Sequence, residues 1–262
     1  MLLRLAGFMT MRLFWRCPRI RSDRDQTFIE DSVKDQLSAS NFSALLSALP
    51  ASLRDTGWFT TKVEGVDQQI VNAAEQICIK LGTAVHGRGG VELETIAPLP
   101  RELAHPRSLS SVHGLGTFPL HIELSHRIRP CRYVVLACLN PGIPSVATAL
   151  LDRHQLAFSA DEKAMLRNAV VLVRSGRRSF YSSILPADEA WMRFDTGCME
   201  AFDARGRAAI EMVEELLTRS SPTLHHWIAG GILVIDNWRV LHGRTSAEGA
   251  VGRRLSRMLV DG

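Results

Sequence analysis

The sequence contains no stretch of 18 uncharged apolar residues, no CxxC pair and no low-complexity tract. The first absence argues against a membrane-spanning helix. The five cysteines are odd in number and widely spaced, so they indicate neither a disulfide framework nor a zinc ribbon, and a reducing, cytoplasmic location is expected. The phosphate cradles GxGxxG and GxxxxGK[ST] are absent, and so are the GxSxG elbow and the HExxH helix of two hydrolase classes.

A net positive charge is also lacking over most of the chain, although the formal net charge of the whole is +4. Residues 1–24 carry six arginines and one acid, so the rest of the chain sums to about −1. Such a body offers no broad basic field to a phosphate backbone, and a nucleic-acid partner is not expected. We expect residues 1–24 to be a basic tail outside the fold, with a targeting peptide as the alternative.

What the sequence does contain is enough apolar residues, 46% of 262, to bury a sizeable core. Apolar spacing predicts helices over residues 39–49, 66–81, 161–173 and 208–217. Short β-rich runs predict strands over residues 91–96, 117–124, 132–139, 145–151, 231–243 and 253–260. We therefore predict a mainly β protein with flanking helices: a closed sandwich or barrel over residues 25–262, in one domain, with a helical insertion at about 152–226.

The first candidate site is the tripeptide His121-Ile122-Glu123, which lies in a strand-like run. Side chains two residues apart in a strand project from the same face, so an imidazole and a carboxylate would converge there. Two convergent ligands are half of a metal site. The alternative is a surface histidine and glutamate on an edge strand.

The second candidate is His242, at the end of the strand-like segment DNWRVLHGR, residues 236–244. Taken alone, it is equally consistent with a histidine that caps a strand by a hydrogen bond into the next turn. Taken with the first motif, it completes a set of two imidazoles and one carboxylate. That set leaves positions open on an iron ion, as in the facial triad of non-haem Fe(II) oxygenases.

These segments, followed by GRRLSRM at residues 252–258, resemble the taurine dioxygenase and clavaminate synthase superfamily of Fe(II)/2-oxoglutarate-dependent oxygenases. The resemblance runs from about residue 81 to 260. It implies a double-stranded β-helix, or jelly roll, with His121, Glu123 and His242 as iron ligands. It also implies Fe(II) as cofactor, with 2-oxoglutarate and O2 as cosubstrates and succinate and CO2 as products.

Two arginines of the GRRLSRM segment, Arg253 and Arg257, lie four residues apart, so on a strand both side chains point the same way. A guanidinium suits the distal carboxylate of 2-oxoglutarate, because it binds carboxylate bidentately and keeps its charge. The resemblance implies this role for Arg253, with Thr148 as a supporting hydroxyl. It places Arg257 at the cosubstrate or substrate end of the pocket.

The candidate substrate residues are Arg193, Asp195 and Ser111. Similar Arg-x-Asp segments in clavaminate-synthase-like enzymes lie beside the substrate, which implies that Asp195 pairs with a substrate amine and Arg193 with an anionic group. The alternative is that these two residues pair with each other across a turn. Ser111, just upstream of the triad strand, is expected to line the same pocket.

The function that the resemblance implies is hydroxylation of an unactivated C–H bond in a small polar metabolite, such as an amino acid or a natural-product intermediate. Glu123 argues against halogenation, since related halogenases lack the carboxylate. One alternative is a catalytically silent jelly-roll protein that binds a metal or ligand. Another is a zinc hydrolase, which would need neither O2 nor 2-oxoglutarate. Neither the substrate nor the oligomeric state follows from the sequence.

Overall fold

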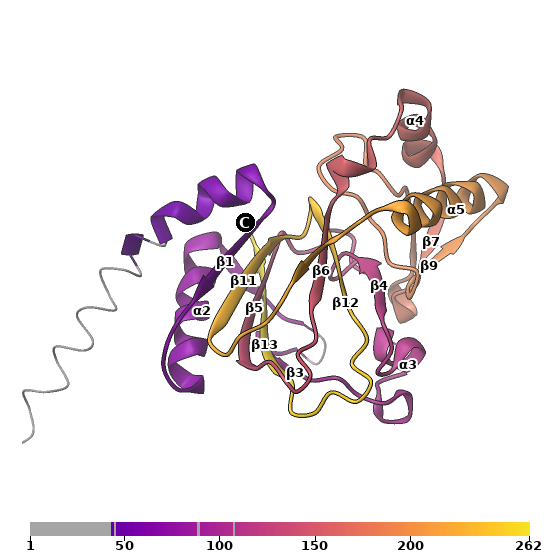
Figure 1. Ribbon diagram of the computed structural model, residues 1–262. Helices are drawn as coiled ribbons and strands as arrows, with labels where there is room; N and C mark the ends of the chain where they lie inside the picture. The colour runs from indigo at the N-terminus through magenta and orange to yellow at the C-terminus, as the bar shows by residue number, and fades with distance from the viewer. Residues whose placement is uncertain (1–42, 45, 88–89, 107) are drawn as a thin grey trace, which may run out of the picture. The chain divides into compact units, whose positions relative to one another are not determined.

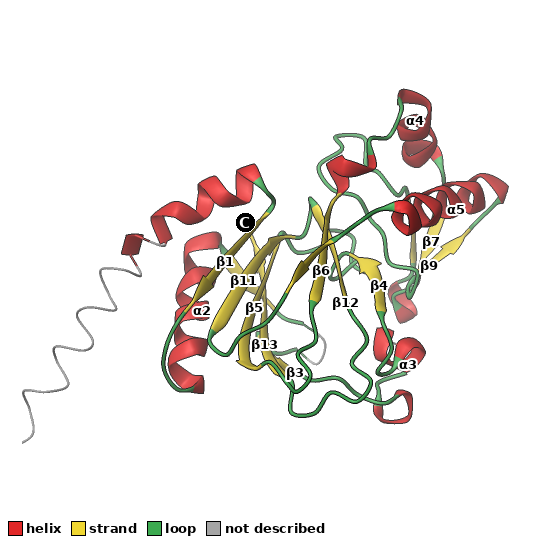
Figure 2. Ribbon diagram, in the orientation of Figure 1, coloured by secondary structure: helices red, strands yellow, loops and turns green. Residues whose placement is uncertain are grey.

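The structure is a computed structural model that describes residues 43–44, 46–87, 90–106 and 108–262. The predicted tail at residues 1–24 and the beginning of the predicted helix 39–49 lie outside the described residues. Residues 43–262 form one compact unit. The predicted fold class, mainly β with flanking helices in a single domain, is confirmed over this part of the chain (Figures 1 and 2).

The larger sheet is antiparallel, with the strand order β1-β11-β5-β13 and with β2 and β3 both pairing with β13. Its strands are β1 (Trp58–Lys62), β2 (Thr83–Val85), β3 (Leu93–Ile96), β5 (Tyr133–Asn140), β11 (Gly231–Asp236) and β13 (Arg254–Asp261). Strands β11 and β5 are almost wholly buried, so both of their faces are apolar. Valine, isoleucine and leucine suit such a strand because they pack well on a pleated surface.

The smaller sheet is also antiparallel and has the strand order β10-β6-β12-β4. Its strands are β4 (Phe118–His121), β6 (Thr148–Asp152), β10 (Thr223–His225) and β12 (Val240–Arg244). The predicted strand 231–243 is in fact two strands, β11 and β12, joined by a turn at residues 237–239. Asp236 accepts a hydrogen bond from the Trp238 backbone in this turn. The chain therefore passes from one sheet to the other there.

The two sheets share one apolar cluster, so they pack face to face. The large sheet contributes side chains such as Leu233 and Leu255, and the small sheet contributes Leu150 and Val240. Alternation along β12 turns Val240 and His242 toward the large sheet, while Leu241 packs into a second cluster on the opposite face. His242 thus lies in the space between the sheets.

Helix α2 (Asp67–Leu81) contacts β5 and β13 of the large sheet. The predicted helix 66–81 is confirmed to within one residue. Its buried positions recur at helical spacing, and Cys78 Sγ lies 3.7 Å from the Met258 Sδ on β13. Residues 46–55 form a further helix ahead of β1 (Figure 1).

The insertion between β6 and β10 carries most of the remaining elements. They are the 3₁₀ turns Arg153–Leu156 and Gly176–Arg178, α4 (Ala160–Asn168), β7 (Val171–Val173), β8 (Phe180–Ser182), β9 (Met199–Ala201) and α5 (Ala204–Arg219). The helical pattern predicted over 161–173 was wrong at its end, because β7 begins at Val171 and forms a small sheet with β8 and β9. The β-branched residues of this strand favour that outcome over helix. The insertion packs on the outer face of the small sheet.

Two short elements precede β4: a 3₁₀ turn (Arg101–Leu103) and α3 (Leu109–His113).

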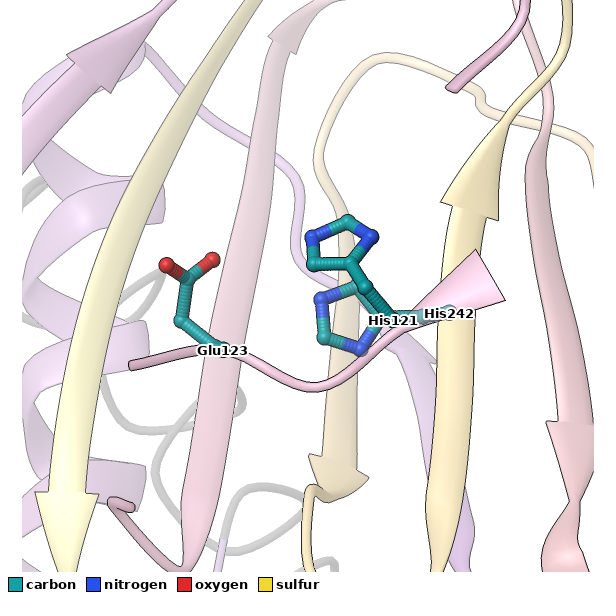
Figure 3. Close-up of side chains that lie close together, drawn as sticks. All are labelled: His121, Glu123 and His242. Carbon is teal, nitrogen blue, oxygen red and sulfur yellow. The ribbon is translucent and has the colours of Figure 1, made fainter. Parts of the chain in front are cut away.

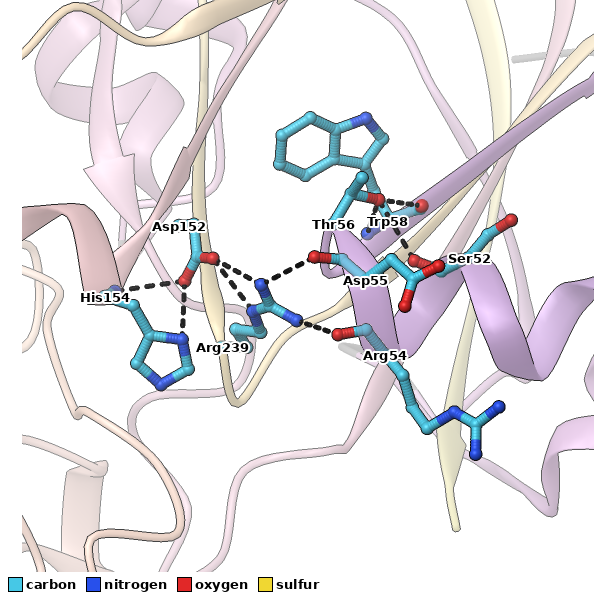
Figure 4. Close-up of polar contacts among 8 residues, drawn as sticks. All are labelled: Ser52, Arg54, Asp55, Thr56, Trp58, Asp152, His154 and Arg239. Carbon is cyan, nitrogen blue, oxygen red and sulfur yellow. Dashed lines mark hydrogen bonds and ion pairs between the residues drawn. The ribbon is translucent and has the colours of Figure 1, made fainter.

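A polar network lies at the end of β6, where Asp152 binds Arg239. The Arg239 Nε lies 2.9 Å from Asp152 Oδ2 (Figure 4). Arg239 also donates to the backbone carbonyls of Arg54 and Asp55. This network ties the start of β12 to the helix that precedes β1. No helix among the described residues is long and apolar enough to cross a membrane.

Candidate metal centre and anion site

His121 and His242 are paired directly across neighbouring strands, at the end of β4 and in the middle of β12. Their ring centroids are 4.8 Å apart, and both side chains are buried (Figure 3). Close approach of the two strands depends on Gly243, because a Cβ at this position would lie 2.6 Å from the Phe118 carbonyl oxygen. The pairing of the strands thus brings two residues 121 positions apart to one point.

Glu123 lies beyond the end of β4, in a turn, whereas the sequence predicts a strand through residue 124. The backbone breaks from the strand because the Ile122 N–H donates to the Phe194 carbonyl, 3.0 Å away, and Leu124 takes a φ of +55°. The prediction that a shared strand face brings Glu123 to His121 was therefore wrong. A turn brings it there instead (Figure 3).

One ligand atom from each of His121, Glu123 and His242 lies within 4.8 Å of the others. The His121 Nδ1 is 2.9 Å from the Pro119 carbonyl oxygen, which can only accept, so Nδ1 carries the proton and Nε2 keeps its lone pair. Burial, followed by the neighbouring His121, lowers the pKa of His242 to about 3. His242 is therefore neutral, as a metal ligand must be.

The carboxylate of Glu123 is ionised at neutral pH. Burial alone would raise its pKa, but the charge of Arg257 outweighs burial and lowers the pKa to about 2. Two neutral imidazoles and one carboxylate are a donor set that suits Fe(II). This donor set, with one ligand atom of each residue within 4.8 Å of the others, fits a bound divalent metal.

Arg257 contacts two carboxylates. Its Nη1 lies 2.5 Å from Glu123 Oε2, and its Nε lies 3.0 Å from Glu94 Oε2. Glu94 is directly opposite Arg257 in the β3–β13 pairing. Both partners of Arg257 are protein carboxylates, and the place predicted for it at the cosubstrate or substrate end of the pocket stays a prediction.

Arg253 is also buried, but it has no ion pair with any carboxylate of the described residues, and its Nε has no hydrogen-bond partner there. The charge of Arg244, another buried arginine, lies close enough for the two guanidinium groups to repel. Arg244 donates to the carbonyls of Gly114 and Gly116, and its guanidinium stacks 3.9 Å from the Phe118 ring centroid. Two adjacent buried cations without a carboxylate form a site suited to an anion.

Thr148 is buried on β6 opposite Arg244 in the β6–β12 pairing. Its Oγ1 accepts a hydrogen bond from Trp227 Nε1 at 3.0 Å. Because the indole N–H can only donate, the Thr148 hydroxyl proton remains available to a ligand. Thr148 therefore lies opposite Arg244 on the neighbouring strand and has a hydroxyl proton to donate to a ligand.

Arg193 has a different position from the one expected of a residue that binds substrate. Its side chain is buried, and it donates to the backbone carbonyls of Ser125, Arg127 and Ile128, and to the Ser182 hydroxyl. Nor does it pair with Asp195, the alternative that the sequence left open. Its guanidinium instead fixes the loop that follows Glu123, because these carbonyls would otherwise lack partners.

The other two candidate substrate residues are half-buried. Asp195 directly follows Phe194, whose carbonyl binds the triad segment, and its Oδ1 accepts from the Gly197 N–H at 2.8 Å. The charge of Asp195 also acts on His113 at the end of α3. The Ser111 hydroxyl in α3 donates to backbone carbonyls of residues 106 and 108.

Sequence reasoning assigned no role to Asn237, Arg244 or Glu94. The first two lie inside the DNWRVLHGR segment, where an asparagine directly after an apolar run and an arginine two residues after His242 were the available signals. Glu94 carried no such signal, because its partner Arg257 is 163 residues away in the sequence. The four described cysteines are free, and burial raises the pKa of the Cys138 thiol to about 11, which makes it a poor nucleophile.

Comparison with known proteins gives a family-model match to part of the chain and several solved structures with a similar fold. Residues 144–259 match the model of the family described as "Taurine catabolism dioxygenase TauD, TfdA family". A comparison with curated proteins finds no match.

Three solved structures illustrate the shared fold. An asparagine oxygenase in complex with Fe(II), 2S,3S-3-hydroxyasparagine and succinate has a TM-score of 0.67 at 16% identity, over 88% of this chain and 84% of that chain. The non-heme iron oxygenase OrfP in complex with Fe, succinate and (3S)-hydroxy-L-Arg has a TM-score of 0.61 at 16% identity, over 90% and 93%. The PvcB protein from Pseudomonas aeruginosa has a TM-score of 0.61 at 14% identity, over 85% and 82%.

Proposed function

We propose that the chain is an Fe(II)/2-oxoglutarate-dependent oxygenase of the taurine dioxygenase and clavaminate synthase-like superfamily, and that it hydroxylates an unactivated C–H bond of a small polar metabolite, such as a free amino acid. The family-model match over residues 144–259 and the fold shared with solved oxygenases support this proposal. Fe(II) is the cofactor, 2-oxoglutarate and O2 are the cosubstrates, and succinate and CO2 are released. The observation that carries the proposal is the convergence of two imidazoles and one carboxylate within 4.8 Å. The two facing antiparallel sheets support a double-stranded β-helix, or jelly roll, as the fold.

In this proposal His121, Glu123 and His242 hold the iron. When bound, Fe(II) supplies the redox chemistry that couples decarboxylation of 2-oxoglutarate to hydroxylation. The protein's part is to present the three ligands already in their binding protonation states. The Pro119 carbonyl holds the proton of His121 on Nδ1, burial keeps His242 neutral, and Arg257 keeps Glu123 ionised.

Arg253 and Thr148 bind the distal carboxylate of 2-oxoglutarate. The support is that Arg253 is buried without a carboxylate partner among the described residues, while the Thr148 hydroxyl has a proton to donate. The bound carboxylate would compensate the repulsion between Arg253 and Arg244. A neutral ligand would leave this cost in place, so the site favours an anion.

Asp195 and Ser111 are proposed to contact the primary substrate, with the Asp195 carboxylate pairing with a substrate ammonium. Asp195 is half-buried and follows the residue that hydrogen-bonds to the triad segment, which supports a place close to the metal. Arg193 is left out of this proposal because protein carbonyls already accept its hydrogen bonds. Solved structures of this fold contain bound 2S,3S-3-hydroxyasparagine and (3S)-hydroxy-L-Arg, which supports an amino acid as the substrate class.

The test is release of succinate from 2-oxoglutarate in the presence of Fe(II), ascorbate and O2, with a panel of free amino acids. We expect turnover with wild type, none with His121→Ala, and full turnover with His226→Ala, which removes an exposed histidine outside the triad. A wild type that binds Fe(II) and 2-oxoglutarate but never releases succinate would favour a silent binding protein. Activity without O2 and 2-oxoglutarate would favour a zinc hydrolase.

A further inference from the structure

Asn237 occupies the turn that joins β11 to β12, five residues before His242, and its side chain is 0% exposed. A buried amide is costly unless its donors and acceptor are paired. The partners that Asn237 finds lie more than 100 residues earlier in the chain, on the segment that carries Glu123.

The Asn237 amide binds both sides of the Glu123 backbone. Its Oδ1 accepts from the Glu123 N–H at 2.7 Å, and its Nδ2 donates to the Glu123 carbonyl at 3.0 Å. Nδ2 also donates to the Cys131 carbonyl at 2.9 Å. This pattern requires the amide in one orientation, because the flipped amide would set its NH2 against the Glu123 N–H.

The Glu123 backbone needs such a partner because the strand has already ended. Strand β4 stops at His121, and Leu124 takes a left-handed φ of +55°. The N–H and C=O of Glu123 therefore have no strand ladder to join, and a side chain from another element replaces it. That element also carries His242, so the same turn holds one ligand and leads into another.

We propose that Asn237 is a positioning residue for the metal centre: it holds the Glu123 peptide in the position from which the carboxylate reaches His121 and His242. The inference rests on the proposed function to the extent that Glu123 binds the metal. Asn237 itself does not touch the metal, the cosubstrate or the reacting atoms. Partners of this kind set ligand orientation, and their loss typically weakens metal binding by about 10- to 100-fold.

A merely structural role predicts something different, namely a loss of stability with no specific effect on the metal. The matched control is Trp238→Phe in the same turn. Trp238 Nε1 donates to the Pro130 carbonyl at 3.0 Å, next to the Cys131 carbonyl that Asn237 binds, and this bond does not involve Glu123. Both variants therefore loosen the turn, but only one releases the Glu123 peptide.

The experiment measures the affinity of the full chain for Co(II) by calorimetry, the visible absorption of the bound Co(II), and hydrogen exchange of the Glu123 amide in metal-free protein. We expect Asn237→Ala to weaken Co(II) binding by at least about tenfold, alter the absorption and speed exchange at Glu123. Trp238→Phe is expected to leave all three close to wild type. If Asn237→Ala does not fold, Asn237→Asp, which keeps the acceptor and the shape, is measured in the same way.

Equal affinity and equal exchange in wild type and Asn237→Ala would overturn the inference, as would an equal loss in Trp238→Phe. These outcomes are separable from failure of the proposed function, because none of the readouts requires turnover. If Co(II) binding depends on Asn237 as expected but the wild type never releases succinate, only the hydroxylase proposal is overturned. Co(II) binding of wild-type strength in His121→Ala would overturn both the hydroxylase proposal and the role of Asn237.

Discussion

Arg257 lies between two carboxylates, with its Nη1 2.5 Å from Glu123 Oε2 and its Nε 3.0 Å from Glu94 Oε2. All three side chains are at least four-fifths buried. The Arg257 guanidinium thus forms ion pairs with Glu123, a proposed metal ligand, and with Glu94, which is not a ligand. Breaking a buried pair leaves charge without compensation, which costs far more than breaking an exposed pair.

Arg257→Met is expected to destabilise the metal-free protein by about 3–5 kcal/mol, because two buried carboxylates lose their partner. Mn(II) should stabilise this variant more than it stabilises wild type, since the metal then replaces the missing positive charge beside Glu123. Urea unfolding with and without Mn(II) measures both effects. The matched control is Arg174→Met, which breaks the exposed pair with Glu200 and should respond to Mn(II) like wild type. Equal Mn(II) effects in both variants would contradict the assignment of Glu123 as a ligand.

Arg253→Ala should raise the apparent KM for 2-oxoglutarate at least about tenfold, because a charge-assisted bidentate pair contributes roughly 1.5–3 kcal/mol. The control is Arg254→Ala, one residue further along, where an exposed arginine pairs with Asp67. Initial rates of succinate formation at varied concentrations of 2-oxoglutarate give the KM and the kcat of each variant. A flat KM with reduced kcat in Arg253→Ala would show that another group anchors the cosubstrate.

Arg193→Met is expected to lower the free energy of unfolding by at least about 3 kcal/mol, because the carbonyls of Ser125, Arg127 and Ile128 lose the charged donor of a buried arginine. The KM for 2-oxoglutarate should stay unchanged in the protein that remains folded. Arg178→Met, which removes an exposed arginine of the same insertion, is the control. If Arg193→Met kept full stability and raised only the KM of the primary substrate, a substrate role for Arg193 would be restored.

Asp152 gives a pH-dependent test. Burial alone would raise its pKa, but hydrogen bonds from Arg239 and from the His154 backbone outweigh burial and hold the pKa below its ordinary value. A carboxyl with a depressed folded-state pKa stabilises the fold above the unfolded pKa of about 3.9 and loses this contribution as the pH falls further. The stability difference between wild type and Asp152→Asn should therefore shrink below about pH 4. Urea unfolding across a pH series checks it, and a constant difference would contradict the role of the ionised carboxylate.

Much of the fold could be predicted from local patterns. The helix at 66–81 and the strands around residues 133–140 and 254–261 follow from apolar spacing, because burial of one face or of both faces leaves a periodic trace in the chain. The strand β7 escaped this reasoning, since a short apolar run after a helix continues the helical pattern almost as well. Only its pairing with β8 and β9 selects the strand.

For the site, the sequence by itself determined which residue types are present and in what order: two histidines, one glutamate and an arginine-rich C-terminal segment, a combination that indicates Fe(II) chemistry. Tertiary structure alone decided how they meet. It placed Glu123 in a turn whose backbone binds the Asn237 amide, and it paired Arg257 with Glu94. It also directed the Arg193 guanidinium to the backbone carbonyls of the loop that follows Glu123. The reason is physical: periodicity records which face of an element avoids water, whereas the partner of a buried polar group depends on which distant backbone or carboxylate the folded chain brings beside it.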